Sequence, residues 1–406
     1  MNKPAFSALR LPGYKMYLST FVLTMMADNV EHVVSYWVMF RKFDSPMLGG
    51  FAVVSHWLPY ILFSVWVGAL NDRFDSRRLI QAGAALFILA SAGWAFFFLT
   101  DTLTIPGAML LLVCHGCAGV LWMTSSQMLL YDIVGQENLR SAVRLAATGR
   151  YIGTLVGPGV GSLILRFVGA RHGMLLNTAF YLPLIVWLVR APYGRHFRGD
   201  AAPPKRAVRG IGDITSTIHE VRPIPVLSAM ILLAGGVSFF IGNSYQAQMP
   251  GFAVDLGHGD PGVSYMMLLG ADAAGALVAG IMLEARGGIF RIQPRTAMIL
   301  AAAWAASLAC FAQVGAYWPA VALLFVAGFF ELSFSSMVQT LVQMNAPDAS
   351  RGRVLGLYNM AGSGLRTFSG ITVGFVGGAI GVHLSLQLAA IGLVVAIAII
   401  AVKFRA

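Results

Sequence analysis

Twelve hydrophobic stretches run almost end to end through the sequence, separated by short segments that hold most of the charge. Each stretch has about 20 residues or more, which is long enough to cross a hydrocarbon core of about 30 Å as a helix. The pattern therefore predicts an all-α integral membrane protein. The predicted spans cover residues 17–40, 47–71, 79–100, 104–131, 142–168, 172–190, 223–249, 262–284, 292–314, 317–344, 353–377 and 381–402.

The composition agrees with a membrane protein and excludes an ordinary soluble domain. Hydrophobic residues make up 57% of the 406 residues and charged residues only 11%, whereas a soluble domain carries roughly 25%. No small-residue cleavage site follows the first span, so we interpret that span as a retained helix rather than a signal peptide. Cys114 and Cys117 lie within a span, where we expect small packing residues rather than a redox or metal pair.

The chain has a net charge of +11, and its Lys and Arg residues lie mainly in segments on one side of the predicted membrane. If the N-terminus lies inside, 22 of the 28 Lys and Arg residues fall in cytoplasmic segments, and only those at positions 41, 42, 166 and 171 fall outside. The positive-inside rule then places both termini in the cytoplasm. The basic surplus is explained without nucleic-acid binding, so we expect no nucleic-acid partner.

One segment, 191–222, is long enough to be a linker, and it is rich in proline and basic residues. It divides the chain into an N-terminal six-span unit (1–190) and a C-terminal six-span unit (223–406). The two units share short patterns at matching positions, which argues for related bundles. Gly68, Asp72 and Arg73 correspond to Gly280, Glu284 and Arg286, and the pair Arg150 and Gly161 corresponds to Arg366 and Gly377.

A charged hairpin between the second and third spans carries the most specific motif, formed by Gly68, Asp72, Arg73, Arg77 and Arg78. These residues resemble the signature of the major facilitator superfamily, with Ser76 in place of the usual glycine. The surrounding sequence is most similar to the branch of siderophore exporters and macrolide efflux pumps, the transmembrane secretion effectors.

This resemblance implies a major facilitator fold, with twelve transmembrane helices in two pseudo-symmetric six-helix bundles. It also implies that the hairpin latches the bundles together at the cytoplasmic side during alternating access. A carboxylate there can face the N-terminal dipole of a neighbouring helix. We expect Asp132, at the cytoplasmic end of the fourth span, to pair with Arg73 or Arg77. A merely solvated loop would explain the arginines but not Gly68 and Asp72.

The fifth span carries glycines at every fourth position, in a stretch that includes Gly153, Gly157, Pro158 and Gly161. Glycines spaced in this way lie on one helix face and allow a close helix contact, while proline favours a kink. The stretch resembles the antiporter motif of exporters in the superfamily, with Ser162 at the last glycine position. Ordinary small-residue packing explains it as well, so it only favours export.

Charged side chains in the middle of a span cost about 2.5–3.5 kcal/mol each on insertion scales, so they require partners or a watery cavity. The first span holds a polar stripe at helical spacing that includes Asp28, Glu31 and His32. We expect it to face a cavity, with a buried structural network as the alternative. The other mid-span charges are Arg150, Asp272, Glu331 and Arg366.

These groups suggest roles in coupling and recognition. We expect Asp28 or Glu31 to carry the coupling proton, and Arg150 and Arg366 either to steer an anionic substrate group or to pair with acids. His56 and His115 are interpreted as packed polar residues. Four polar residues near the outer end of the seventh span either line an exit or form an interfacial belt: Asn243, Tyr245, Gln246 and Gln248.

The function that fits these features is a proton-coupled exporter of a small amphiphilic molecule, such as a siderophore or a drug. We expect a monomer in a bacterial inner membrane, with no cofactor beyond the proton gradient. One alternative is a divalent-metal exporter that resembles ferroportin, with Asp28 and His32 as ligands. A membrane-embedded enzyme or sensor is a further alternative, but the sequence offers neither a nucleophile with its base nor an appended soluble domain.

Overall fold

The computed structural model describes residues 5–43, 46–194, 208–242, 244–257, 263–285, 289–369 and 376–404. Within these ranges the regular elements are all helices. Eight of the described helices are long and apolar enough to cross a membrane, and the longest of them contains two of the predicted spans. The all-α membrane fold predicted from the sequence is therefore confirmed.

The N-terminal half contains five long helices after a short 3-10 turn at Ser7–Arg10. These are α1 (Pro12–Phe43), α2 (Pro46–Arg73), α3 (Ser76–Thr100), α4 (Ile105–Phe167) and α5 (Gly169–Arg190). The fourth and fifth predicted spans both lie in α4, which is interrupted at Gly135. This residue has φ 63° and ψ 178°, a conformation that glycine adopts readily because it lacks a Cβ.

The segment predicted as a linker is partly helical. Within 191–222 the structure places α6 (Ile211–Val221), whereas residues 195–207 lie outside the described part of the chain. Asp213 at the start of α6 accepts a hydrogen bond from the backbone N–H of Arg209 at 2.6 Å. This bond ties Arg209, the residue before the N-cap Gly210, to the first turn of α6, where the helix dipole favours a carboxylate.

The C-terminal half is less regular than the sequence predicted. Its helices are α7 (Pro225–Phe240), α8 (Ser244–Ala247), α9 (Met249–Asp255), α10 (Val263–Ala285), α11 (Pro294–Phe311), α12 (Tyr317–Asn345), α13 (Arg351–Asn359), α14 (Arg366–Ser369), α15 (Val376–Ile380) and α16 (Val382–Phe404). The prediction of one continuous helix over 223–249 is wrong, because α7 ends at Phe240 and Gly242 adopts a positive φ of 50°. Between α13 and α14, a π-helical turn covers Met360–Gly364.

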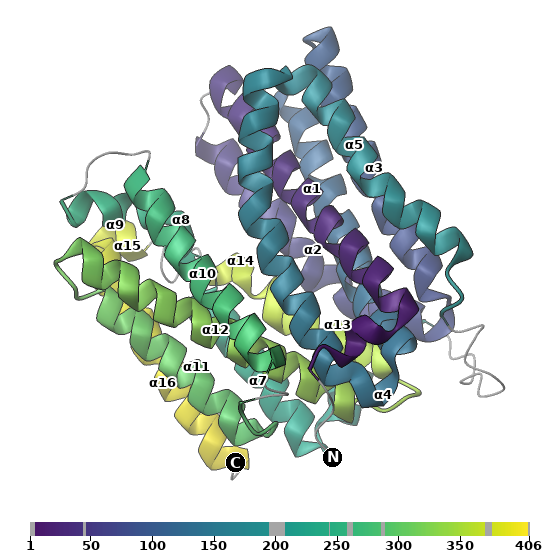
Figure 1. Ribbon diagram of the computed structural model, residues 1–406, viewed down its shortest axis with the longest axis vertical. Coiled ribbons are helices and arrows are strands. Elements are labelled where there is room, and N and C mark those ends of the chain that lie inside the picture. The colour runs from purple at the N-terminus through teal and green to yellow at the C-terminus, as the bar shows by residue number, and fades with distance from the viewer. Residues whose placement is uncertain are drawn as a thin grey trace.

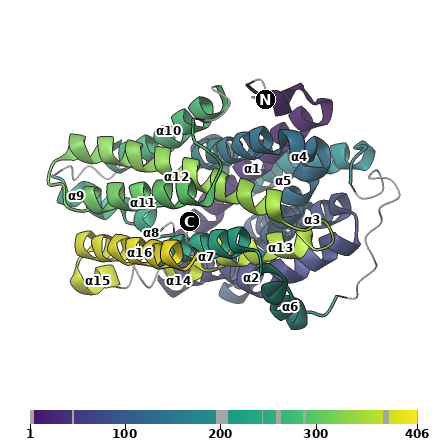
Figure 2. The ribbon, with the colours of Figure 1, turned by 90° about the horizontal axis from the view of Figure 1, so that it is seen from below.

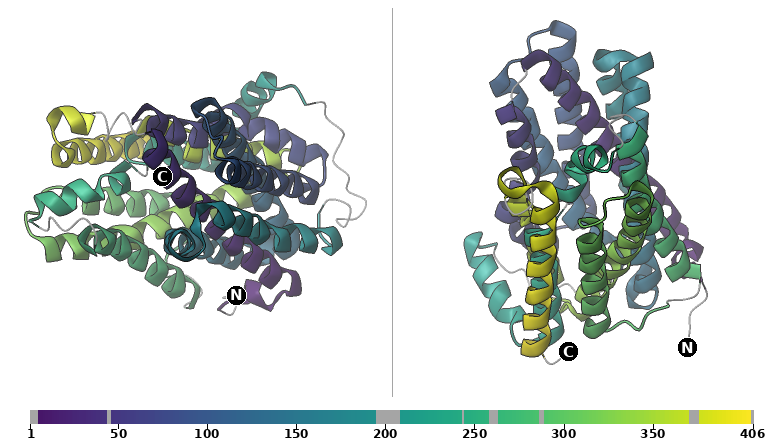
Figure 3. Two further views of the ribbon diagram at one scale, coloured as in Figure 1. Left: turned by 90° about the horizontal axis from the view of Figure 1, so that it is seen from above. Right: turned by 90° about the vertical axis from the view of Figure 1, so that its left-hand side faces the viewer.

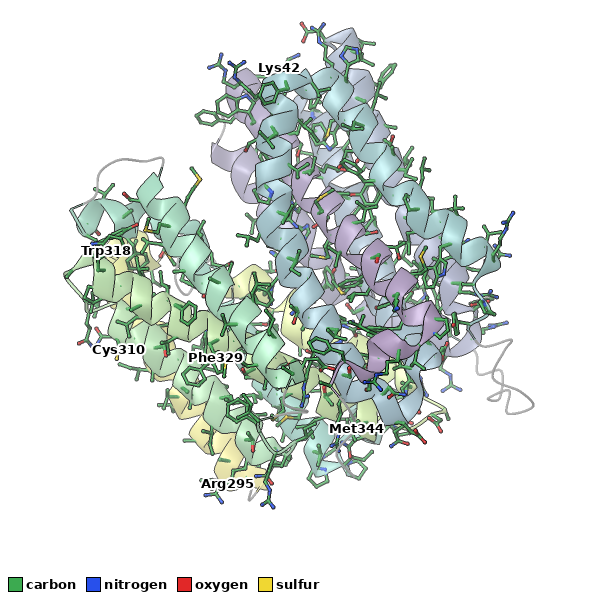
Figure 4. All side chains as sticks on the ribbon, viewed as in Figure 1. Lys42, Arg295, Cys310, Trp318, Phe329 and Met344 are labelled. Carbon is green, nitrogen blue, oxygen red and sulfur yellow. The ribbon has the colours of Figure 1, made fainter. Side chains whose placement is uncertain are left out.

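Figure 1 shows α1 to α5 in one bundle and α7 to α16 in a second, with both chain termini at the same end. Seen from that end in Figure 2, α13 lies against α2, and the right-hand view of Figure 3 shows both termini at the lower end of the molecule. Lys42 lies at the opposite end, and Arg295 lies near the C-terminus (Figure 4). We call these the terminal end and the distal end.

The glycine-rich stretch in α4 packs directly on α1. A Cβ at Gly153 would come within 2.5 Å of the Met25 Cβ, and one at Gly157 would come equally close to the Asn29 Cβ. Gly161 faces Val33 in the same way, at 3.1 Å. Helices in lipid associate through such close contacts, because apolar burial gives them no driving force. Pro158 lies on the exposed side of the same turn.

Candidate transport cavity and gate

A cavity of about 300 Å³ lies between the two halves. Aromatic side chains and charged groups of both signs share its wall. Its lining includes Met25, Asp28, Asn29, His32, Tyr36, His56, Trp57, Tyr60, Phe87, Trp122, Arg150, Tyr151, Gln246, Glu331 and Arg366. The residues come from α1, α2, α3, α4, α8, α12 and α14, so both bundles contribute. Of the expected mid-span charges, Asp28, Arg150, Glu331 and Arg366 line this space.

His115 of α4 bridges the two carboxylates of the α1 stripe. Its Nε2 lies 2.8 Å from Asp28 Oδ1, and its Nδ1 lies 2.8 Å from Glu31 Oε1. All three residues are buried, with exposed fractions of 9% for Asp28, 1% for Glu31 and 4% for His115. The stripe therefore reaches its partner through a helix that the sequence pattern did not connect to it.

Glu31 is anchored further. Ser91 of α3 donates a hydrogen bond to Glu31 Oε2, and Asn177 of α5 donates to Ser91 Oγ at 3.1 Å. The chain of bonds from Asp28 through His115, Glu31 and Ser91 to Asn177 thus links α1, α3, α4 and α5. Such a network needs a full set of donors, because an unpaired carboxylate in low dielectric is costly. A neutral imidazole carries one N–H, so hydrogen bonds at both ring nitrogens of His115 require a second proton, on the ring or on one of the acids.

Two further histidines lie beside this network. The ring centroids of His32 and His115 are 4.8 Å apart, and those of His32 and His56 are 4.9 Å apart. Sequence reasoning interpreted His56 and His115 as separate packed residues. The structure instead brings them together with His32 from α1, α2 and α4.

A second acidic centre lies in the C-terminal half. Tyr245 Oη lies 3.1 Å from Asp272 Oδ2 and 3.4 Å from Glu331 Oε2, so one hydroxyl joins the two carboxylates. Gln246 donates to Asp272 Oδ2 at 3.1 Å. Tyr245 and Gln246 were expected either to line an exit or to form an interfacial belt. Both contact this acidic pair, and Gln246 also lines the cavity, whereas Asn243 lies outside the described residues.

Arg150 and Arg366, which occupy corresponding positions in the two halves, both face the cavity. The Arg366 guanidinium lies over the Trp57 ring at 5.0 Å, and that of Arg150 lies 6.0 Å from the Tyr151 ring centroid. Neither forms an ion pair within 4 Å with an acid in the described part of the chain. Aromatic faces stabilise a guanidinium without neutralising it, so both groups bring positive charge to a cavity wall that also holds the Glu331 carboxylate.

The halves meet at the terminal end, where α2 crosses α13. Gly68 lies so close to Gly352 that a Cβ on either would collide with the backbone of the other. One turn later, Asp72 accepts hydrogen bonds from the backbone N–H of Gly352 at 2.6 Å and of Arg353 at 3.2 Å, and from Arg353 Nε at 3.2 Å. Asp72 therefore caps the N-terminus of α13, where the helix dipole also favours a negative charge.

The basic residues of the hairpin make contacts within their own half. Arg77 binds Asp75 with Nη2 at 2.7 Å and donates to the Ala191 carbonyl at 2.5 Å, while Arg78 donates to Gln81 at 3.0 Å. The Arg73 guanidinium lies over Phe74 at 5.4 Å. The pairing of Asp132 with Arg73 or Arg77 stays a prediction.

A second contact between the halves involves Glu284 at the end of α10. Ser141 of α4 donates a hydrogen bond to Glu284 Oε1, and the backbone N–H of Phe6 donates to the same oxygen at 2.9 Å. Arg144 donates to the Leu283 carbonyl at 3.0 Å. Glu284 was noted only as the counterpart of Asp72, and its partners carried no signal in the sequence. Arg286, which completed that pattern, lies outside the described residues.

Comparisons with known proteins agree with this architecture. The family described as "Transmembrane secretion effector" matches residues 4–406. The structure of the Escherichia coli fucose:proton symporter FucP is similar with a TM-score of 0.71 at 15% identity, covering 97% of this chain and 98% of that chain. No curated protein matches the sequence significantly.

Two other solved structures share the fold. A bacterial homologue of the iron transporter ferroportin in the outward-facing state gives a TM-score of 0.74 at 13% identity, covering 97% of this chain and 98% of that chain. The human organic anion transporter MFSD10 gives 0.66 at 12% identity, covering 96% and 100%. From the family match over nearly its whole length and from this fold, the chain belongs to the transmembrane secretion effector family of major facilitator transporters.

Proposed function

We propose that this transporter exports a small amphiphilic molecule, such as a siderophore or a drug-like compound, in exchange for protons. The observation that supports this proposal is the composition of the cavity wall. Trp57, Tyr60 and Trp122 offer apolar area, while Arg150 and Arg366 add two cations to a wall that also holds Glu331. A molecule with an apolar body and an anionic group complements both features.

The proton is carried by the Asp28–His115–Glu31 network. Coupling requires that the network bind its proton more tightly in one state than in the other. Asp28 lines the cavity, whereas Glu31 is buried behind it, so solvent reaches the network from the cavity. Reopening the cavity to the other side changes which compartment supplies the proton.

We further propose that the terminal end faces the cytoplasm of a bacterial cell. The excess of Lys and Arg in the segments at that end supports this orientation. The closed contacts at Asp72 and Glu284 would then seal the cavity from the cytoplasm, which corresponds to the outward-facing state.

Proteoliposomes with an imposed pH gradient test the proposal. A panel of siderophores and macrolides is offered to the purified protein, and we expect concentrative, gradient-dependent transport of at least one compound. Asp28→Asn and Glu31→Gln should abolish accumulation while leaving exchange of labelled for unlabelled substrate. Asp255→Asn, at an exposed residue outside the cavity that pairs with His383 of its own half, serves as the control. Accumulation that persists in both cavity variants would remove the network from the coupling step.

A further inference from the structure

Three histidines that the transport proposal does not use as a group converge at one end of the cavity. His32, His56 and His115 come from α1, α2 and α4, and each offers one ring nitrogen within 4.8 Å of the others. Two of the rings belong to the cavity lining, so solutes in the cavity reach them. Three imidazoles from three different helices of one rigid half form a concentrated set of nitrogen donors.

Two ring nitrogens of these histidines are buried and form no hydrogen bond in the described part of the chain. Nε2 of His32 and Nδ1 of His56 have no hydrogen-bond partner there. A buried polar atom that lacks a partner costs about 1–3 kcal/mol, so its placement calls for a ligand. Packing alone explains the rings but not why both nitrogen atoms are left without a partner.

The third histidine is already oriented as a metal ligand would be. Glu31 Oε1 holds Nδ1 of His115 at 2.8 Å, and Ser91 holds Glu31 in turn. Carboxylates that fix the far nitrogen of a histidine in this way are typical of metal sites, because they set the ring orientation and raise ligand basicity. Nε2 of His115 then points at Asp28 Oδ1, 2.8 Å away.

We propose that His32, His56, His115 and Asp28 bind one divalent first-row transition-metal ion, such as Zn²⁺ or Co²⁺. The ion enters between His115 Nε2 and Asp28 Oδ1, and the proton of that hydrogen bond passes to water. Three imidazoles and one carboxylate suit such ions and do not suit Mg²⁺ or Ca²⁺, which prefer oxygen ligands.

The site closes by small rotations of side chains. The histidine nitrogens lie within 4.8 Å of one another, whereas ligands of a tetrahedral zinc ion with bonds of about 2.0 Å lie roughly 3.3 Å apart. His32 and His56 make no hydrogen bond through the buried nitrogens, so no such bond opposes the movement of their rings. This inference is independent of the amphiphilic cargo, because the metal binds whether or not that cargo is transported.

Binding of Co²⁺ to the purified full-length protein tests the proposal, with an affinity tag free of histidine. We expect one Co²⁺ per chain, visible ligand-field absorption typical of a tetrahedral site, displacement by Zn²⁺ and none by Mg²⁺. His32→Phe and His56→Phe keep an aromatic ring but remove the ligand, and each should weaken binding about tenfold or more.

The control is His383→Phe. His383 contacts the Ala312 carbonyl and Asp255 at the distal end, away from the cavity, and its replacement should leave Co²⁺ affinity unchanged. Thermal unfolding confirms that each variant is folded. The proposal is overturned if the folded wild-type protein binds no Co²⁺, or if His32→Phe and His56→Phe bind it as tightly as the wild type. Loss of amphiphile transport alone would not affect it.

Discussion

At the terminal end, Asp72 is half-buried and Glu284 is buried, and both bond the opposite half of the chain, whereas at the distal end Asp101 and Asp255 are exposed and bond their own half. Asp72 accepts hydrogen bonds from two backbone amides and a guanidinium where α2 crosses α13. The distal acids are 82% and 53% exposed, and their partners are side chains that water screens. Charge therefore stabilises the closed terminal end but adds little at the distal end.

This difference gives the two ends different mechanical roles. Contacts between the halves that are buried and bonded at one end favour the state in which that end is closed. Exposed pairs within one half do not change with the angle between the halves, so they do not favour either state. A transporter that alternates must break the terminal contacts in each cycle, and we expect substitutions there to shift the equilibrium between states.

The largest effect should come from Gly68→Leu. A side chain at position 68 collides with the Gly352 backbone, so α2 and α13 must separate. Overpacking of this kind costs about 1–3 kcal/mol. The ratio of molecules with an open terminal end to those with a closed one should therefore rise by roughly fivefold to 150-fold. Spin labels at Phe74 and Asn345 in a cysteine-free background should report a longer distance between the halves.

The matched control lies on the same helix. Gly49 is near the distal end of α2, and a Cβ there meets nothing within 4 Å. Gly49→Leu should therefore leave the distance between the labels unchanged. Equal effects of the two variants would mean that the ends do not differ in the way the contacts suggest.

The next largest effect is expected for Asp72→Asn. The carboxylate accepts three hydrogen bonds from Gly352 and Arg353, and the neutral amide retains one acceptor oxygen. Hydrogen bonds to charged groups contribute about 1.5–3 kcal/mol, so the closed state should lose a large part of that free energy. The same spin-label pair measures the shift, and Asp255→Asn at the distal end, whose carboxylate is 53% exposed and pairs with His383 of the same half, should produce none.

The sequence was sufficient to predict Gly68 and Asp72 as residues of this latch, but not Gly352, whose backbone N–H binds Asp72. Gly68 and Asp72 are four residues apart on one helix, so a local motif identifies them. Gly352 lies 280 residues away from Asp72, and nothing near it in the sequence marks an amide that needs a carboxylate. That pairing depends on how two bundles dock, which a single sequence does not encode locally.

For the cavity, too, the sequence identified residues of one helix but not their partners on other helices. Helical spacing placed Asp28, Glu31 and His32 on one stripe of α1, because the periodicity of a helix is readable from residue order. The partner, His115, lies in an apolar stretch of α4, and its contact depends on the depth and rotation of that helix. Ser91 and Asn177 gave no signal either. The breaks after Phe240 and at Met360–Gly364 fall in glycine- and serine-containing stretches, and helices in membranes tolerate such residues, so the composition alone did not mark a break.

A smaller effect is expected for Ser141→Ala. Ser141 donates to Glu284 Oε1 and accepts from the Ala8 backbone N–H at 3.2 Å, so its loss removes one link between the halves. Phe6 still donates to Glu284. The closed state should lose about 1 kcal/mol. A double-mutant cycle with Asp72→Asn should give additive shifts in the label distance distribution, because the two contacts share no residue. Strong coupling would show instead that they act as one unit.

The smallest effect should come from the distal end, with Asp101→Asn. Lys42 Nζ donates to Asp101 Oδ1 at 2.9 Å, and this hydrogen bond and the charge of Lys42 lower the pKa of the carboxyl below its ordinary value of about 3.9. A lowered pKa in the folded state means that the pair stabilises the fold above the unfolded-state pKa and loses that contribution as the pH falls through the folded-state pKa. The group is exposed, so water and salt screen the pair, and the melting temperature at neutral pH should not change measurably.

The melting temperatures of wild type and Asp101→Asn should differ only slightly above pH about 4 and should converge as the pH falls through the folded-state pKa of Asp101. A clear drop in melting temperature at neutral pH, or a shift in the distance between labels at Phe74 and Asn345, would show that the distal end also takes part in closing the molecule.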